Sequence, residues 1–333
     1  MMRPALAAAA ILLVAGCSGS GRRAAVPPPA RESGFGALAA GWRTDFSRTL
    51  VSPSEFQAGG PGKDGIPAIT HPRFLRPADV HHLGAREPVI EFVHDGDARA
   101  YPLQILVWHE IVDDRVGGTP VAVTFCPLCN TAIAFDRGVG GKTLEFHVSG
   151  NLRNSDLVMY DTATESWWQQ FGGRALVGRY AGTNLRQLPA RIVSFADFAH
   201  AHPNGLVLSR ETGFHRPYGD NPYPGYDDIS SPPYFATAHA NDRRLPAKER
   251  VVLLERAGDS VAVPFSVLRR RNVVDVTVAG HELTVRWRPG VGSPFGSGDV
   301  GSAQVLEHGR PVTFDEPFWF AVAAFRPQVV LIR

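Results

Sequence analysis

The chain has 333 residues, which is enough for one large or two medium-sized domains with a substantial core. Charged residues make up 20% of the chain and the formal net charge is +2, so the composition gives no electrostatic reason to expect a nucleic-acid partner. The 34 glycines and 27 prolines favour many short strands and turns over long helices. We therefore predict a β-rich α+β fold with short antiparallel strands and short helices.

Residues 1–17 have the features of a lipoprotein signal peptide. A single arginine precedes a short apolar run, and residues 14–17 (Val-Ala-Gly-Cys) resemble a bacterial lipobox. We expect Cys17 to carry lipid and to anchor an exported protein to the membrane, facing the periplasm or the cell exterior. The alternative is an ordinary secretory signal with a chance cysteine. Residues 18–41 are rich in Gly, Ser, Ala, Arg and Pro and are predicted to form a disordered tether.

The body of the protein is predicted to start with a loop-rich segment and a hairpin. Residues 42–85 lack regular periodicity, so we expect them to wrap around the rest of the chain. Residues 86–210 open with a strand over 89–93, a hairpin turn over 94–97 and a returning strand over 98–101.

A short apolar helix is predicted next, over residues 103–108, because Pro102 stands where a helix can begin. His109 and Glu110 follow at its C-terminal end. The alternating apolar residues of 120–136 then predict a strand, a tight turn and a second strand. The turn holds two cysteines, Cys126 and Cys129.

The order of sequence features recurs at a constant offset of 162 residues (for example 289 − 127 = 162). The matching pairs are Gly96 and Gly258, Asp97 and Asp259, Ala100 and Ala262, Pro102 and Pro264, Val112 and Val274, Asp113 and Asp275, Gly118 and Gly280, Val123 and Val285, and Pro127 and Pro289. We predict an internally duplicated unit, with the first repeat over residues 86–210 and a second, degenerate repeat over residues 249–333.

The second repeat lacks the reactive groups of the first. At the constant offset, Cys126, Cys129, His109 and Glu110 correspond to Arg288, Val291, Arg271 and Asn272. These groups are therefore not needed to build the unit. The first repeat is also longer, with its extra length around residues 149–161 and 164–169. Within this extra length, Arg153, Asn154 and Asp156 either line the same pocket as the cysteines or cap turns.

A connecting segment over residues 211–248 lies between the repeats. Its Pro, Gly and Tyr content predicts a long loop without regular structure. The loop could cover the cysteine site, and we expect it to be a packed connector instead.

Several ordered motifs together resemble one family, the domain of unknown function (DUF) 3179 family. They are residues 100–103 (Ala-Tyr-Pro-Leu), 108–112 (Trp-His-Glu-Ile-Val), 121–129 (Val-Ala-Val-Thr-Phe-Cys-Pro-Leu-Cys), 148–150 (Val-Ser-Gly), 157–161 (Leu-Val-Met-Tyr-Asp), 165–167 (Glu-Ser-Trp) and 216–219 (Arg-Pro-Tyr-Gly). The resemblance extends from about residue 70 to the end of the chain. It implies an exported protein of bacteria or archaea and supplies no established reaction.

The Cys-Pro-Leu-Cys spacing is typical of a knuckle in which two thiolates bind one metal ion. The sequence has no second cysteine pair, so further ligands must be histidine, methionine or carboxylate. Two thiolates with an imidazole and a thioether suit copper, or zinc. We therefore predict a soft-metal site for metal handling or redox chemistry, with Cys126, Cys129, His109 and Met159 as ligands. Core packing is the alternative role of Met159 and of His109.

Two other functions are compatible with the cysteine pair. The first is a thiol–disulfide oxidoreductase, with His109 as catalytic base and Glu110 orienting its imidazole. The predicted strands on both sides of the pair argue against it, since an activated thiol usually lies at a helix N-terminus. The second is a ligand-binding or assembly module in which the knuckle only shapes a loop. Closing so short a loop contributes little chain entropy, so we rank this function last.

Overall fold

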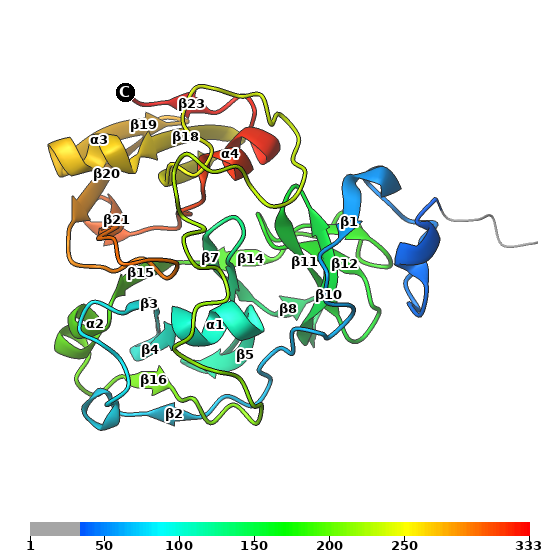
Figure 1. Cartoon of the computed structure of the whole chain (residues 1–333), viewed down its shortest axis with the longest axis horizontal. Helices are drawn as coiled ribbons and strands as arrows, with labels where there is room; N and C mark the ends of the chain where they lie inside the picture. Colours follow the sequence, from blue (N-terminus) through cyan, green and yellow to red (C-terminus); the bar gives the residue numbers. More distant parts are fainter. Residues whose placement is uncertain (1–33) are drawn as a thin grey trace, which may run out of the picture. The chain divides into compact units, whose positions relative to one another are not determined.

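The computed structural model describes residues 34–333, which form short strands in six small sheets together with short helices (Figure 1). The predicted β-rich α+β class is confirmed. The α-helices are α1 (Leu103–His109), α2 (Phe195–Ala201), α3 (Phe265–Arg271) and α4 (Trp319–Phe325), and the 3-10 helices are η1 (Gly36–Ala39), η2 (Pro53–Glu55) and η3 (Pro77–Asp79). Cys17, the predicted signal peptide and most of the predicted tether lie outside the described residues.

The end of the predicted tether is ordered. Here η1 occupies part of the stretch expected to be disordered, and Phe35 beside it is buried. The Phe35 ring packs edge-on against Trp167, with ring centroids 5.6 Å apart. Burial of this aromatic side chain offsets the entropy of ordering the short stretch around it, so the folded body begins earlier than residue 42.

The thiol-bearing sheet is antiparallel and follows the predicted strand–turn–strand order. It comprises β14 (Arg186–Leu188), β7 (Thr131–Asp136), β6 (Thr119–Cys126) and β5 (Ile111–Val116). A two-stranded ribbon follows it, made of β8 (Gly138–Val139) and β9 (Lys142–Thr143).

The predicted first hairpin is confirmed and lies in a second sheet. This sheet comprises β15 (Ala190–Ser194), β3 (Pro88–His94), β4 (Asp97–Pro102), β16 (Leu206–Leu208) and β2 (Phe74–Leu75). β16 pairs with β4 in parallel, so the strands are not all antiparallel as expected. The long connection from β4 to β16 allows this parallel pairing.

The extra length of the first unit forms most of a third sheet. It comprises β1 (Phe56–Ala58), β10 (Phe146–Arg153), β11 (Asp156–Asp161), β12 (Trp167–Gln169) and β13 (Ala175–Val177). β1 belongs to the loop-rich N-terminal segment and pairs with β10. The N-terminal segment therefore borders two sheets, since its β2 also pairs with β16.

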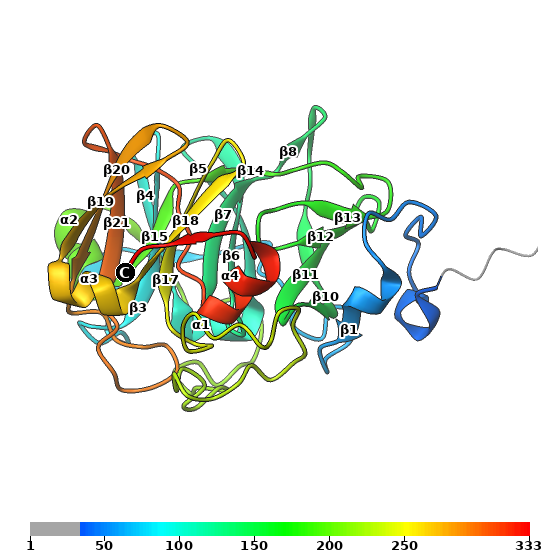
Figure 2. The same cartoon turned by 90° about the horizontal axis from the view of Figure 1, so that it is seen from above.

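Two sheets form the C-terminal part of the chain, and their elements follow the order of the first unit. They comprise β17 (Val251–Arg256), β18 (Asp259–Pro264) and β23 (Val330–Leu331), and β19 (Val273–Val278), β20 (His281–Arg288), β21 (Ser302–Glu307) and β22 (Arg310–Pro311). β4, α1, β5 and β6 each have a counterpart 162 residues later, in β18, α3, β19 and β20. Figure 2 shows α3 beside β19 and β18.

The largest hydrophobic core contains buried side chains of α1, β6, β7 and β11. It continues into α4 through Trp319 and its neighbours, so the last helix of the chain packs with the first unit. Both cysteines belong to this core. The fold therefore places the thiols deep in the protein.

Candidate metal centre

The two cysteines lie on the tight turn between β6 and β7. Cys126 is the last residue of β6 and pairs across the sheet with Thr131, the first residue of β7. Only 1% of Cys126 and 0% of Cys129 is exposed, and the two thiols are not joined in a disulfide. The hairpin thus holds two free thiols together in an apolar environment.

The carboxyl group of Asp156 forms a compact group with the two thiols. The Cys129 thiol donates a hydrogen bond to Asp156 Oδ1 at 2.9 Å. One ligand atom from each of Cys126, Cys129 and Asp156 lies within 4.8 Å of the other two, and all three residues are buried. The structure therefore supports the interpretation in which Asp156 lines the cysteine pocket.

Neighbouring groups fix the Asp156 carboxylate. Its Oδ2 accepts hydrogen bonds from the Phe171 backbone N–H at 2.9 Å and from the Gln169 side-chain amide. These contacts come from β12 and the turn after it. The carboxylate is thus oriented toward Cys129 by the extra sheet of the first unit.

A second chain of hydrogen bonds holds the Cys129 thiol in place. The Thr131 hydroxyl lies 2.9 Å from Cys129 Sγ and donates to Gln170 Oε1 at 2.6 Å. The Gln170 amide donates in turn to Thr124 Oγ1 at 2.9 Å. Such outer contacts orient the groups that bind a metal ion.

The group is acidic and has no basic partner close by. Burial raises the pKa of the Cys126 and Cys129 thiols and of the Asp156 carboxyl group. None of the ion pairs among residues 34–333 includes Asp156. A low-dielectric site disfavours uncompensated anions, and a bound cation would reverse that effect.

Glu110 is next to this group. It caps α1 with φ 59°, and its carbonyl accepts the backbone N–H of Phe125, the residue before Cys126, at 2.8 Å. Only 6% of Glu110 is exposed. Burial, followed by repulsion from Asp156, raises the pKa of its carboxyl group to about 8. Asn272 caps α3 with φ 60°, so this backbone conformation belongs to both units and not to the site alone.

His109 is held elsewhere. Its Nδ1 donates to the Pro67 carbonyl at 2.7 Å, and its Nε2 accepts from the Tyr218 hydroxyl at 2.6 Å. Both ring nitrogens are therefore occupied, and His109 is outside the group formed by the thiols and Asp156. Burial lowers the pKa of His109 to about 4. This geometry is that of a satisfied core histidine, one of the two roles considered for it.

Met159 is also directed away from Asp156. Both residues lie on β11, and an odd spacing of three positions places their side chains on opposite faces of a strand. Met159 is fully buried in the largest core, opposite Val148 and Trp168 on the adjacent strands. Core packing accounts for its position.

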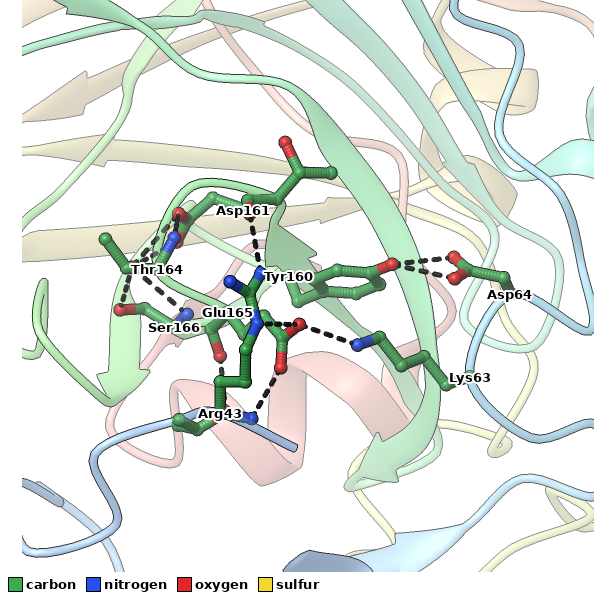
Figure 3. A network of polar contacts seen from close by, with 10 residues as sticks. Arg43, Lys63, Asp64, Tyr160, Asp161, Thr164, Glu165 and Ser166 are labelled. Carbon is green, nitrogen blue, oxygen red and sulfur yellow. Dashed lines mark hydrogen bonds and ion pairs between the residues drawn. The ribbon is translucent and has the colours of Figure 1, made fainter. Parts of the chain in front are cut away.

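Tyr160 of the Met-Tyr-Asp motif and the nearby Glu165 contact the N-terminal segment (Figure 3). The Tyr160 hydroxyl donates to Asp64 Oδ2 at 2.8 Å. Glu165, after β11, accepts from Arg43 N at 2.6 Å and from Lys63 Nζ at 2.9 Å. These contacts fasten the N-terminal segment to the extra sheet and involve neither thiol.

The connecting segment, expected to be a packed connector, packs through Tyr226 and Tyr223 on the core that contains the cysteines. Figure 1 shows this yellow-green segment crossing α1 and β7 toward α4. Burial raises the pKa of Tyr223 and Tyr226. The acidic groups of Glu110, for Tyr223, and of Cys126, for both tyrosines, also raise it. Tyr226 and Ser155, the residue before Asp156, are both buried, and Tyr226 packs in the same hydrophobic core as the two cysteines. The tyrosines thus close the site from one side.

A family model described as "Protein of unknown function (DUF3179)" matches residues 63–329. Among curated proteins and solved structures, none matches this chain. Within residues 34–333, no helix is long and apolar enough to cross a membrane.

Proposed function

The chain belongs to the DUF3179 family, and we propose that it binds one thiophilic metal ion through Cys126, Cys129 and Asp156. The observation that supports this function is the buried group itself, whose three ligand atoms lie within 4.8 Å of one another. Two ligand atoms bound to one tetrahedral zinc ion lie roughly 3.3–3.8 Å apart. A small adjustment of side chains would therefore suffice to surround an ion.

The ligand types favour zinc over copper. Zinc accepts thiolate and carboxylate ligands together, whereas Cu(I) is selected by sulfur ligands such as a thioether. The carboxylate of Asp156 lies in the group, and the thioether of Met159 does not. The proposed ligand set therefore differs from the one expected from sequence, because Asp156 replaces both Met159 and His109. We assign His109 a positioning role at the end of α1.

Elemental analysis of protein purified under reducing conditions tests this function. Protein supplied with Zn²⁺ or Cu(I) should retain one ion per chain, and Cys126→Ser, Cys129→Ser and Asp156→Asn should each lose it. Asp315→Asn is the matched control, since Asp315 is also buried but belongs to no such group. Equal metal content in all four variants and the wild-type protein would remove the proposal.

We propose further that Glu110 transfers protons beside the ion, which makes a metal-dependent enzyme the second candidate function. Three protein ligands leave one position of a zinc ion open for water or substrate. Glu110 is a buried carboxyl group close to Asp156, and a carboxyl group beside a metal-bound water can accept a proton from that water. The visible spectrum of Co²⁺-substituted protein should show a protonation step that Glu110→Gln abolishes while metal content is kept. A spectrum with the same pH dependence in both proteins would exclude this role.

The geometry supports a thiol–disulfide oxidoreductase less well. A reactive thiol needs exposure and a lowered pKa, and burial raises the pKa of both thiols here. No helix N-terminus lies at the turn, because strands flank it. Trapping of a mixed disulfide by Cys126→Ser or Cys129→Ser would favour this alternative over metal binding.

We also propose that the chain arose by internal duplication and that only the first unit kept a metal site. The four pairs of elements at the 162-residue offset support the duplication.

Lipid at Cys17 would place this site outside the cytoplasm. Incorporation of labelled fatty acid into the wild-type chain, and its loss in Cys17→Ser, is the expected outcome; equal labelling of both would contradict the anchor.

A further inference from the structure

Three consecutive charged residues, Lys248, Glu249 and Arg250, are buried just before β17. They line a cavity of about 310 Å³ between the connecting segment, the start of β17 and α3. Consecutive buried charges are rare, because each must find a partner to offset its loss of hydration. The question is therefore which of these charges are paired.

The acidic residues that line the cavity have donors of their own. Glu249 Oε1 accepts the Ser266 backbone N–H at 2.8 Å, in the first turn of α3. Asp227 accepts from the Ser293 hydroxyl. Asp299 accepts the backbone N–H of Gly290 at 3.0 Å and pairs with Arg86 at 3.0 Å. Each of these carboxylates thus has a donor of its own, and Asp227 in addition attracts Lys248 and Arg250 without forming an ion pair with either.

The two buried cations lack such partners. Lys248 Nζ donates to the Ser231 hydroxyl at 2.7 Å and lies 3.6 Å from the centre of the Tyr226 ring. Arg250 is 6% exposed, and its guanidinium has no carboxylate within 4.0 Å among residues 34–333. One of its terminal nitrogens, Nη2, is buried without any hydrogen-bond partner in that part of the chain. Glu316, whose two carboxylate oxygens are also buried without a hydrogen-bond partner in that part of the chain, and Asp227 attract Arg250 from beyond ion-pair distance.

Burial lowers the pKa of Lys248 to about 8 and that of Arg250 to about 10. Both shifts have the sign expected for cations whose loss of water outweighs the attraction of the nearby carboxylates. Arg269 of α3 lines the same cavity and donates to the Asp299 carbonyl at 3.2 Å, a neutral acceptor that leaves its charge unpaired. Three cations therefore face one cavity.

We propose that this cavity binds the oxyanion of a small molecule, a carboxylate or a phosphate group, between Lys248, Arg250 and Arg269. The guanidinium fork of a buried arginine suits two oxygens of such a group, and a lysine adds a point charge. The volume lies at the small end of the range for ligand pockets.

The cavity and the thiol site have common walls. Phe318 lines the cavity, and its backbone N–H donates to the Cys129 carbonyl at 2.9 Å. The Tyr226 ring contacts Lys248 and belongs to the same hydrophobic core as both thiols. An anion in this cavity would therefore lie next to the proposed metal centre, yet its binding does not depend on the metal.

Calorimetric titration with inorganic phosphate and with succinate, at constant ionic strength in chloride, tests the proposal. One equivalent of one probe should bind, and the probe that binds identifies the oxyanion. Replacing one charged donor should raise its Kd by about 10- to 100-fold. Cys126→Ser should bind the probe as the wild-type protein does, which separates this site from the metal centre.

The matched pair Arg269→Met and Arg270→Met keeps the test independent of folding. Both arginines are exposed on α3, and only Arg269 lines the cavity. We expect weaker binding in Arg269→Met and in Arg250→Met, and unchanged binding in Arg270→Met. Absence of binding by both probes, or equal affinity in Arg269→Met and Arg270→Met, would overturn the proposal.

Discussion

His109 illustrates how a single buried side chain connects three parts of the chain. The Thr212 hydroxyl is hydrogen-bonded to the Tyr218 hydroxyl, Tyr218 donates to His109, and His109 donates to the Pro67 carbonyl. The imidazole must stay neutral to accept from Tyr218. The family motifs that contain His109 and Tyr218 therefore meet in a structural contact between α1, the N-terminal segment and the connecting segment.

Stability should fall in acid because of His109. Its pKa is about 4 in the folded protein and 6.5 when unperturbed, so the unfolded chain binds more protons between these values. The contribution of His109 to the free energy of unfolding is therefore fully present above pH 6.5. It is lost as pH falls toward 4, by about 3 kcal/mol at most. Urea unfolding at pH 7, 5.5 and 4.5 should show a smaller loss in His109→Gln than in the wild-type protein. Equal losses would contradict this role.

Two tyrosines of the connecting segment should differ in how much stability is lost when the hydroxyl is removed. Tyr218→Phe leaves His109 Nε2 buried without a donor and should cost about 1–3 kcal/mol of unfolding free energy. Tyr226→Phe removes a buried hydroxyl whose near partners, Ser155 and the Tyr234 backbone, do not meet strict hydrogen-bond geometry, so it should cost less, within about 1 kcal/mol. Denaturant unfolding of both variants measures the difference. A larger loss in Tyr226→Phe would contradict the hydrogen-bond assignment.

At the scale of elements, β10 contains a bulge where the N-terminal segment crosses it. Its register against β11 shifts between Val148 and Leu152, and the Gly59 backbone N–H donates to the Gly150 carbonyl at 2.8 Å. Gly150 has φ 77°, and a Cβ there would overlap Pro61 O and lie 2.6 Å from the Gly62 carbonyl carbon. The close approach of two backbones therefore requires glycine.

Gly150→Ala should destabilise the protein more than Gly141→Ala. Both glycines have φ 77°, so both substitutions carry the same backbone strain of about 1 kcal/mol, but a Cβ on Gly141 has no neighbour within 4 Å. The clash at Gly150 should add about 1–3 kcal/mol. Thermal and urea unfolding of the pair, with hydrogen exchange over residues 56–65, would show this excess. Equal destabilisation would mean that the N-terminal segment is not packed there.

The helix caps explain why one neighbour of His109 reaches the thiols. Glu110 leaves α1 with a positive φ, so its side chain departs from the helical path that His109 follows. The adjacent residues consequently face different surroundings, Glu110 toward Asp156 and His109 toward Tyr218. Sequence spacing predicted His109 beside the cysteines and Glu110 as the residue that orients its imidazole, because spacing does not show in which direction each side chain leaves the helix.

Across the whole molecule, local patterns predicted local structure well. Alternation and turn residues identified the β3–β4 and β6–β7 hairpins, and Pro102 marked the start of α1. The constant 162-residue offset identified matching elements in the two halves. These features depend on neighbours in sequence, which is why they could be read without a structure.

The complete site could not be predicted in the same way. Asp156 reaches Cys129 from another sheet, 27 residues later in the chain. The useful signal was the extra length of the first unit, which carries Asp156 and which the second unit lacks. The cover by Tyr226 and the packing of Met159 are tertiary outcomes, because neither follows from the periodicity of its own segment.

X-ray absorption at the zinc edge tests the central claim most directly, because it reports the atoms bound to the ion. For zinc-loaded wild-type protein we predict two sulfur ligands at about 2.3 Å and oxygen ligands at about 2.0 Å, without the outer-shell scattering of an imidazole. Asp156→Asn, which is expected to lose the ion, should give no zinc-edge signal above background. A spectrum with no sulfur ligand, or with imidazole bound, would contradict a centre built from Cys126, Cys129 and Asp156.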